Sequence, residues 1–247
     1  MKTVYFYGCS FTAGDELSDF EYPELCNHPN AEIYTVARRK FLATGGDKIR
    51  TYFQKNRSRS YPAKVSAAGF NCENFAENGA SLEDMICKII LHVSEKKKPD
   101  IVFLQIPPLY REALFYNEWP FIDTLMLNNL GVNVNAANYS DYMKSKIMSF
   151  DGSHFAIGDL MKLYMLKYFL DQQNIKLYLI EMVNDLKLRY SLATNEKYKN
   201  IIDTIKQIPL FDVDPIVKAT PSPYCTAGHF NEKIHSIMAD RIVALIG

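Results

Sequence analysis

The sequence predicts an α/β fold in which helices cover both faces of a parallel sheet. Runs of apolar, β-branched and aromatic residues alternate along the chain with segments whose large apolar residues recur at helical spacing. Strands that alternate with helices form parallel sheets, because each crossover helix packs back onto a face of the sheet. With 247 residues, of which 48% are hydrophobic and 23% charged, the chain is long enough to bury the core of such a domain.

Three strands are strongly marked and a fourth is weaker. The strong runs are residues 3–8, 101–106 and 176–183, and the weaker run is residues 71–76. Helices are predicted at residues 62–68, 81–93, 155–170 and 232–246. The second of these begins at Ser81 with two acidic residues in its first turn, and Asn231 is the expected N-cap of the last.

Residues 22–60 and 107–150 are too long for ordinary connections between a strand and a helix. We therefore expect two insertions near the functional edge of one domain that spans residues 1–247, since no repeat or Pro/Gly-rich linker divides the chain. The first insertion has eight cations and one acid, Asp47, between residues 38 and 59. A loop of this charge can neutralise several phosphates, although a charge run is more commonly a solvated face. The second insertion is aromatic and begins with Tyr110 and Arg111.

The gross composition argues against several classes of partner. A formal net charge of +0 provides no global field for recruiting nucleic acid, so we do not expect nucleic acid as the partner. No window is long and apolar enough to span a membrane, and the apolar run before Gly8 is too short for a secretory signal. The five cysteines are an odd number without CxxC spacing, which favours reduced thiols and a cytoplasmic protein. No histidines stand at HxxxH spacing beside carboxylates, so no metal site is expected.

Ser10 follows the first strand in "YFYGCSFTAGDEL", residues 5–17. Ligands of open α/β sheets bind beyond the carboxyl ends of the strands, and a serine nucleophile needs a base to take its proton. His229, in the loop before the last helix, is favoured over His154, which precedes the strand at 176–183. The remaining histidines are interpreted as structural, and they are His28, His92 and His235.

Three segments resemble the SGNH (GDSL-type) hydrolases, in order and in spacing. "YGCSFTAGDEL" is similar to their first block, "NFAENGAS" (residues 74–81) to their second and "AGHFNEKIHSIMADRI" to their last. Phage-encoded members in particular resemble these strings. The resemblance implies a flavodoxin-like three-layer α/β/α fold. It also implies that Ser10 is the nucleophile, that His229 is the general base and that the backbone N–H groups of Ser10 and Gly79 are oxyanion donors.

Two positions depart from the pattern of that family. The third block normally supplies an asparagine amide, whereas "VFLQIPPLYR" (residues 102–111) offers only Gln105, whose alternative role is a buried strand end. The last block normally has an aspartate two or three residues before its histidine, but this chain has Thr226 and Ala227 there. A main-chain carbonyl or a more distant carboxylate would have to orient the imidazole instead, and the candidates are Asp151, Asp212 and Asp214.

The resemblance predicts a serine esterase that hydrolyses an O-acyl ester through an acyl-serine intermediate, without a metal or an organic cofactor. Its substrate would be a small-molecule or carbohydrate ester, with O-acetyl carbohydrates among the classes. Tyr110 and Arg111 are candidate substrate contacts, with a surface ion pair as the alternative for Arg111. The alternative function is a degenerate module that binds a carbohydrate or another ligand without catalysis. The oligomeric state is left open.

Overall fold

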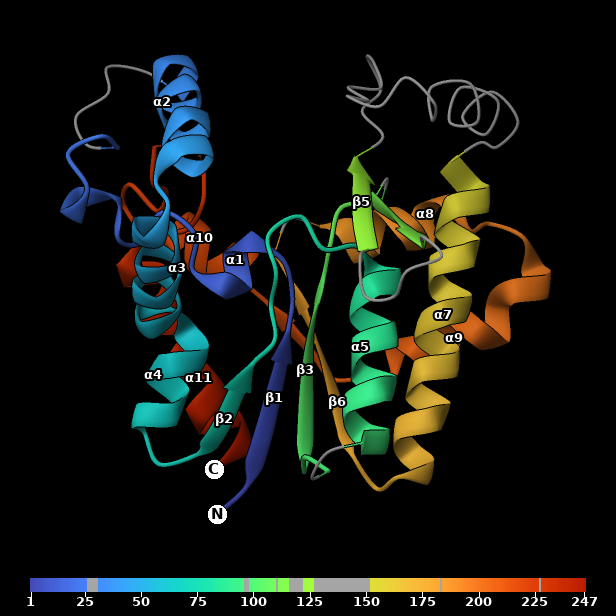
Figure 1. The fold of residues 1–247 in the computed structure, drawn as a ribbon. Coiled ribbons are helices and arrows are strands. Elements are labelled where there is room, and N and C mark those ends of the chain that lie inside the picture. The colour runs from blue at the N-terminus through green and yellow to red at the C-terminus, as the bar shows by residue number, and fades with distance from the viewer. Residues whose placement is uncertain are drawn as a thin grey trace. The chain divides into compact units, whose positions relative to one another are not determined.

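The computed structural model describes residues 1–25, 31–95, 98–109, 111–115, 122–126, 152–182, 184–226 and 228–247 (Figure 1). The chain divides into two compact units. The first combines Met1–Asn78 with Val213–Gly247, and the second is Gly79–Asp212. Strands β2 and β1 are neighbours in the first unit, and β3, β6 and β7 follow one another, in that order, in the sheet of the second unit. None of the helices formed by the described residues is long and apolar enough to cross a membrane.

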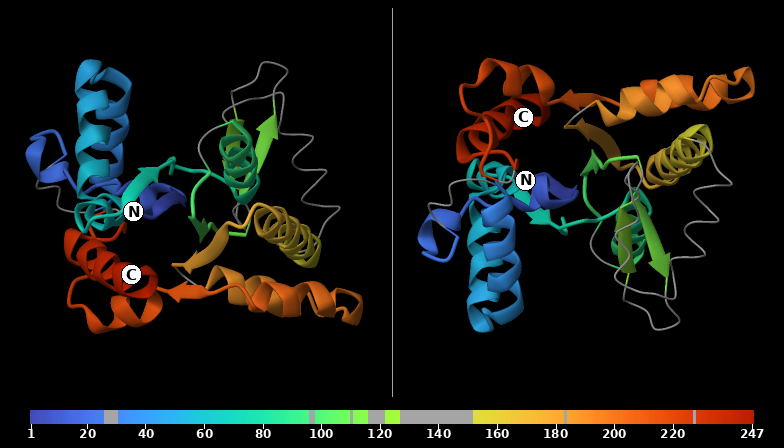
Figure 2. Two further views of the ribbon diagram at one scale, coloured as in Figure 1. Left: turned by 90° about the horizontal axis from the view of Figure 1, so that it is seen from below. Right: turned by 90° about the horizontal axis from the view of Figure 1, so that it is seen from above.

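The first unit is built around a parallel strand pair. Its elements are β1 (Thr3–Tyr7), α1 (Ser10–Ala13), η1 (Asp19–Glu21), α2 (Ala31–Thr44), α3 (Asp47–Arg59), α4 (Tyr61–Ala67), β2 (Asn71–Asn74), α10 (Asp214–Ala219) and α11 (Glu232–Ile246). All five residues of β1 are buried, as its run of apolar and aromatic residues predicts. It pairs in parallel with β2, with Thr3 opposite Asn71. Helices α4 and α11, far apart in the sequence, pack side by side (Figure 2).

Helices α2 and α3 occupy most of the first predicted insertion and have their own apolar core. The buried members of that core are Tyr22, Leu25, Tyr34, Phe41 and Tyr52. The eight cations lie on these two helices and not in a loop. Apolar residues at helical spacing form the buried face of each helix, and the cations lie between them in the sequence. Within the part of the chain that the structure describes, four of the eight form ion pairs with carboxylates, and they are Arg38, Lys48, Lys55 and Arg59. This pairing weakens the case for a phosphate-binding surface.

The second unit contains the other parallel strands. Its elements are α5 (Leu82–Glu95), β3 (Ile101–Ile106), β4 (Arg111–Phe115), β5 (Ile122–Met126), α7 (Gly152–Gln172), β6 (Lys176–Glu181), α8 (Asp185–Leu192), η2 (Glu196–Tyr198), α9 (Lys199–Lys206) and β7 (Leu210–Asp212). Strand β3 pairs in parallel with β6, with Ile101 opposite Lys176, and β6 pairs with β7. Strands β4 and β5 form an antiparallel pair inside the second predicted insertion. Helices α5 and α7 lie beside each other (Figure 1).

The strands predicted from the sequence are present, with small changes at their ends. Strand β2 stops at Asn74, two residues before its predicted end, where the Asn74 side chain accepts a hydrogen bond from the Ala76 N–H. Strand β7 was not predicted, because its three residues are too few for a periodic signal. The single-domain organisation over residues 1–247 stays a prediction.

Candidate active site

Ser10 lies where β1 ends and α1 begins. The chain leaves the strand through Gly8, and Cys9 caps the short helix, with its carbonyl accepting the N–H of Ala13 at 3.0 Å. The Ser10 carbonyl accepts the N–H of Asp15, also at 3.0 Å, and this hydrogen bond fixes the backbone that follows the serine. Ser10 is 8% exposed. Its hydroxyl is therefore fixed in a largely buried turn at the carboxyl end of a buried strand.

Gly14 makes the turn that follows α1 possible. Its φ of 78° lies in the left-handed region, and a Cβ at this position would lie 2.6 Å from the backbone oxygen of Asn56 and 2.8 Å from Ser60 Cβ. A side chain would therefore be strained and would also collide with α3 and the residue that ends it. Because the chain turns so tightly here, the next two residues, Asp15 and Glu16, are directed into the interior, where both are buried.

A short loop before α11 presents His229. Tyr224 and Phe230 form an antiparallel bridge across this loop, and the His229 carbonyl accepts the N–H of Cys225 at 2.7 Å. Asn231 then caps α11 by accepting the N–H of Ile234 at 3.1 Å, which confirms the N-cap predicted from the sequence. The loop is thus fixed on both sides of the histidine.

The imidazole of His229 connects the Ser10 hydroxyl to a buried carboxylate. His229 Nε2 lies 2.8 Å from Ser10 Oγ, and Nδ1 lies 2.7 Å from Glu16 Oε2. The same Glu16 oxygen accepts the backbone N–H of His229 at 3.1 Å. With the Glu16 side chain fully buried and acting as acceptor, the arrangement favours the tautomer with hydrogen on Nδ1. That tautomer leaves the Nε2 lone pair directed at the serine hydroxyl.

Glu16 reaches this position in a strained backbone conformation. Its φ of 69° is in the left-handed region, which costs an L-residue with a side chain about 1–2 kcal/mol. Such strain persists at functional sites because the surrounding contacts over-determine the residue. Here the two hydrogen bonds to His229 and the burial of the carboxylate provide those contacts.

This chain resembles known proteins in its structure and not in its overall sequence. No protein-family model matches the sequence, and no curated protein matches it. A G-D-S-L lipolytic family structure from Desulfitobacterium hafniense matches with 11% identity over 100% of both chains and a TM-score of 0.52. The esterase EstA from Pseudoalteromonas sp. matches with 9% identity over 99% of this chain and 96% of that one, with a TM-score of 0.52. The fold is that of the GDSL-type hydrolases. The predicted α/β class, a three-layer arrangement around a parallel sheet, is thereby confirmed.

A carbohydrate-active protein has the same GDSL-type fold. The acetyl xylan esterase Est2A from Butyrivibrio proteoclasticus matches 99% of this chain and 63% of its own length, with 11% identity and a TM-score of 0.51. At these identities the likeness concerns the fold alone. The chemistry of this chain has to be argued from its own residues.

The acid beside His229 is not one that the GDSL-type pattern led us to expect. Asp214 forms an ion pair with Lys218 at 2.5 Å, and Asp212 belongs to the second unit. Asp151 lies outside the described residues. Glu16 takes the orienting position instead, six residues after the serine and 213 residues before the histidine. The sequence did contain a signal, since two acids follow Gly14, but nothing in the sequence indicated that the turn faces His229.

The other predicted site residues lie in the second unit or outside the described residues. Gly79 opens the second unit with a φ of 80°, and Gln105 is buried near the end of β3. Arg111 is the first residue of β4, and Tyr110 lies outside the described residues. The roles predicted for these four residues stay predictions.

Three of the other histidines are placed on helices. His235 is buried on α11, where its Nδ1 accepts the N–H of Tyr61 at 3.1 Å. Burial lowers the pKa of His235 to about 3, so the ring is neutral at physiological pH. His92 lies in α5 and His154 in α7, both in the second unit. His28 lies outside the described residues. In the described part of the chain, no group of three or more His, Cys, Asp or Glu is placed to hold a metal ion.

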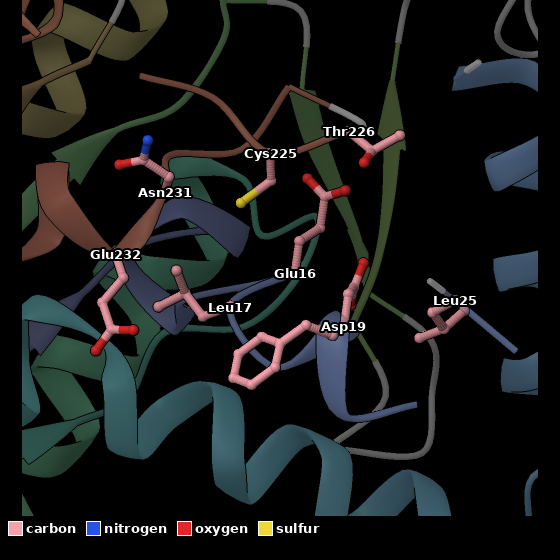
Figure 3. A pocket seen from close by; sticks show the side chains of 9 residues that line it. Glu16, Leu17, Asp19, Leu25, Cys225, Thr226, Asn231 and Glu232 are labelled. Carbon is pink, nitrogen blue, oxygen red and sulfur yellow. The ribbon is translucent and has the colours of Figure 1, made fainter. Parts of the chain in front are cut away.

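An acidic pocket of about 360 Å³ borders Glu16 (Figure 3). Its lining includes Asp19 and Cys225. Burial raises the pKa of Asp19 to about 6, against the lowering effect of hydrogen bonds from two tyrosines. Burial also raises the pKa of Cys225 to about 12, and the nearby carboxylates add to this effect. Cys225 is therefore a neutral thiol at physiological pH, which makes it a poor competitor to Ser10 as nucleophile.

Proposed function

We propose that this protein is a serine esterase in which Ser10 is the nucleophile, His229 the general base and Glu16 the acid that orients the base. The observation that carries the proposal is the continuous set of contacts from Ser10 Oγ through the imidazole to the buried Glu16 carboxylate. A serine hydroxyl needs a base to become nucleophilic, and that base needs a partner to fix its tautomer. All three groups belong to the first unit.

In the first half of the reaction, Ser10 Oγ attacks the ester carbonyl while its proton passes to His229 Nε2. The imidazolium that forms is stabilised by the Glu16 carboxylate, which accepts the hydrogen bond from Nδ1. The negative charge moves to the carbonyl oxygen. The predicted donors to this oxyanion are the N–H groups of Ser10 and Gly79 and the amide of Gln105, each typically worth ~3 kcal/mol in the transition state. The intermediate then collapses, and Nε2 returns the proton to the departing alcohol.

In the second half of the reaction, water takes the place of the alcohol. His229 Nε2 accepts a proton from water as the oxygen attacks the acyl-serine ester, and it later returns that proton to Ser10 Oγ. The products are a carboxylic acid and regenerated enzyme. Every proton transfer in this scheme is made by the imidazole, so a cofactor has no step to perform.

The substrate is proposed to be a small-molecule or carbohydrate ester, with an O-acetyl carbohydrate as one class. The folds of the esterase EstA and of an acetyl xylan esterase support this choice by likeness. Tyr110 and Arg111 remain the proposed substrate contacts. The alternative of a non-catalytic binding module has two motives, the absence of an acid before His229 and the absence of the asparagine of the third block. Glu16 removes the first motive, because it lies beside Nδ1 where the missing aspartate would lie, and Gln105 is the proposed substitute for the asparagine.

Labelling with a fluorophosphonate tests the proposal. We expect a covalent adduct on the peptide that contains Ser10, no adduct in Ser10→Ala and slow labelling in His229→Ala. Matched controls are Ser58→Ala on the exposed face of α3 and His154→Ala on α7, both of which should label at the wild-type rate. Wild-type protein that stays unlabelled while folded, or labels equally well without Ser10, would refute the esterase mechanism.

A further inference from the structure

A second carboxylate lies near the opposite edge of the His229 ring from Glu16. Asp15 Oδ2 is 3.9 Å from Nε2, the nitrogen that contacts Ser10 Oγ, whereas Glu16 contacts Nδ1. The Asp15 side chain is 2% exposed, so water screens it little. A separation of 3.9 Å is too long for a hydrogen bond. Asp15 therefore acts on the imidazole through its charge, not by holding its hydrogen.

Arg38 brings a counter-charge to Asp15 from the first insertion. It lies on α2, and its guanidinium forms an ion pair with the same oxygen, Asp15 Oδ2. The Tyr52 hydroxyl on α3 lies 3.4 Å from the other oxygen, Oδ1. The inserted helices thus hold the second carboxylate in place and neutralise part of its charge.

The arrangement has a defined electrostatic consequence. A proton on Nε2 is favoured by a carboxylate about 4 Å away and disfavoured by a cation nearby. Asp15 Oδ2 lies 3.9 Å from Nε2, and Arg38 is paired with that same oxygen. Removing the Asp15 charge alone should therefore make it harder to protonate Nε2, and removing the Arg38 charge alone should make it easier. Removing both should have a smaller effect than removing either one.

We propose that the Asp15–Arg38 ion pair is an electrostatic positioning element that sets the pH at which His229 takes up a proton on Nε2. The part of this ion pair in catalysis rests on the proposed function: the proton affinity of His229 must match the working pH only if His229 is a general base. Its effect on the imidazole does not rest on that function. The pair is also one means by which the inserted α2 contributes to the site.

The other groups around the imidazole do not duplicate this role. Glu16 contacts Nδ1, and His235 on α11 is kept neutral by its burial. The Phe11 ring, 5.1 Å from the imidazole, has no charge. Further titratable groups near the pair and the loop, among the described residues, are Asp19 on η1, Tyr34 on α2, Tyr52 on α3, Cys9 before α1 and Cys225 in the loop of His229.

An NMR titration of the imidazole tests the proposal without requiring activity. The Cε1–H signal of His229 is followed with pH and assigned by its loss in His229→Gln. In Arg38→Met, the midpoint should move to higher pH, and in Asp15→Asn to lower pH, each by about 1 unit or more. The double variant should return toward the wild-type midpoint. The control is Lys48→Met, which removes an equal charge from an ion pair on α3 whose lysine side chain is 66% exposed.

The outcome separates this inference from the proposed function. Midpoints that coincide in wild type, Arg38→Met and Asp15→Asn would overturn the role of the ion pair, even if Ser10 is labelled normally. Opposite shifts in a protein that never labels would support the electrostatic role and refute the esterase. If Arg38→Met does not fold, Arg38→Gln takes its place, because a rise in the midpoint has the opposite sign to a general loosening of the Nδ1 contact, which would lower the midpoint as Asp15→Asn does. In active protein, the acidic limb of the kcat/KM profile should shift with the midpoint.

Discussion

Replacing Glu16 with glutamine is the sharpest test of the proposed acid, because the structure fixes how the amide must sit. A single carboxylate oxygen, Oε2, accepts both the ring Nδ1–H and the backbone N–H of His229. In Glu16→Gln, the amide oxygen can take over both contacts. The reverse orientation would place an NH₂ group against two donors and leave the backbone N–H unsatisfied, at a cost of about 1–3 kcal/mol. The glutamine should therefore keep the productive tautomer and remove only the charge.

The magnitude follows from that orientation. Exchanging a charged acceptor for a neutral one weakens a hydrogen bond by about 1–2 kcal/mol, and the imidazolium of the transition state loses that stabilisation. Each 1.36 kcal/mol corresponds to tenfold in rate, so kcat should fall by about 5- to 30-fold. In serine proteases, the matching aspartate-to-asparagine change costs about 10⁴-fold because the tautomer is wrong. The backbone N–H of His229 is what should spare this protein the larger loss.

The assay is hydrolysis of an activated acetate ester at several pH values, with Glu95→Gln on the exposed end of α5 as the control for an uninvolved glutamate. Activity that is unchanged in Glu16→Gln would show that Glu16 is not the acid. A fall as large as that of Ser10→Ala would show that the amide turns its NH₂ toward the ring, which would refute the argument from the shared oxygen.

Three further changes test the framework of the site. Gly14→Ala should lower the free energy of unfolding by about 3 kcal/mol, because the added Cβ meets the Asn56 backbone oxygen at a positive φ; urea unfolding measures this. Asn231→Ala removes the cap on the Ile234 N–H and should cost about 1 kcal/mol in the same assay, with slower labelling of Ser10 as the loop loosens. In the wild type, His235 cannot take up the proton that the unfolded chain binds near pH 6.5, because burial lowers its pKa to about 3. Stability should therefore fall by about 2 kcal/mol between pH 7 and 5, and His235→Gln should lose this part of the pH dependence; equal slopes would contradict the assignment.

Sequence reasoning located the parts of the site that depend on local pattern. Ser10 follows a strand whose residues are all buried, and His229 precedes a helix with a recognisable cap, so both positions can be found from short stretches of sequence. Glu16 could not be found in this way. Its pairing with His229 depends on the tight turn at Gly14, which packs closely against α3, and this packing is visible only once that helix is placed.

The charged first insertion also shows that partners distant in the sequence cannot be recognised from local pattern. A run of eight cations with a single acid predicts a solvated or phosphate-binding segment, because only neighbours in sequence are counted. The partners of these cations lie elsewhere in the chain: Arg38 pairs with Asp15, and Arg59 pairs with Glu21 and with Glu232 on α11. Ion pairs between distant segments leave no local pattern, so the charge of such a run is overestimated until the fold is known.

Placing the acid in the serine turn has a consequence for how the site is held together. Ser10 and Glu16 are joined by one short turn, so their separation is set by the backbone around Gly14 and by the hydrogen bond from the Asp15 N–H to the Ser10 carbonyl. The loop of His229 then has to supply only the imidazole. Because Glu16 binds both the ring and the backbone N–H of His229, the acid also fixes the loop itself. Disturbing the serine turn should therefore displace the base as well as the nucleophile, whereas changes in the loop should leave the Ser10–Glu16 geometry intact.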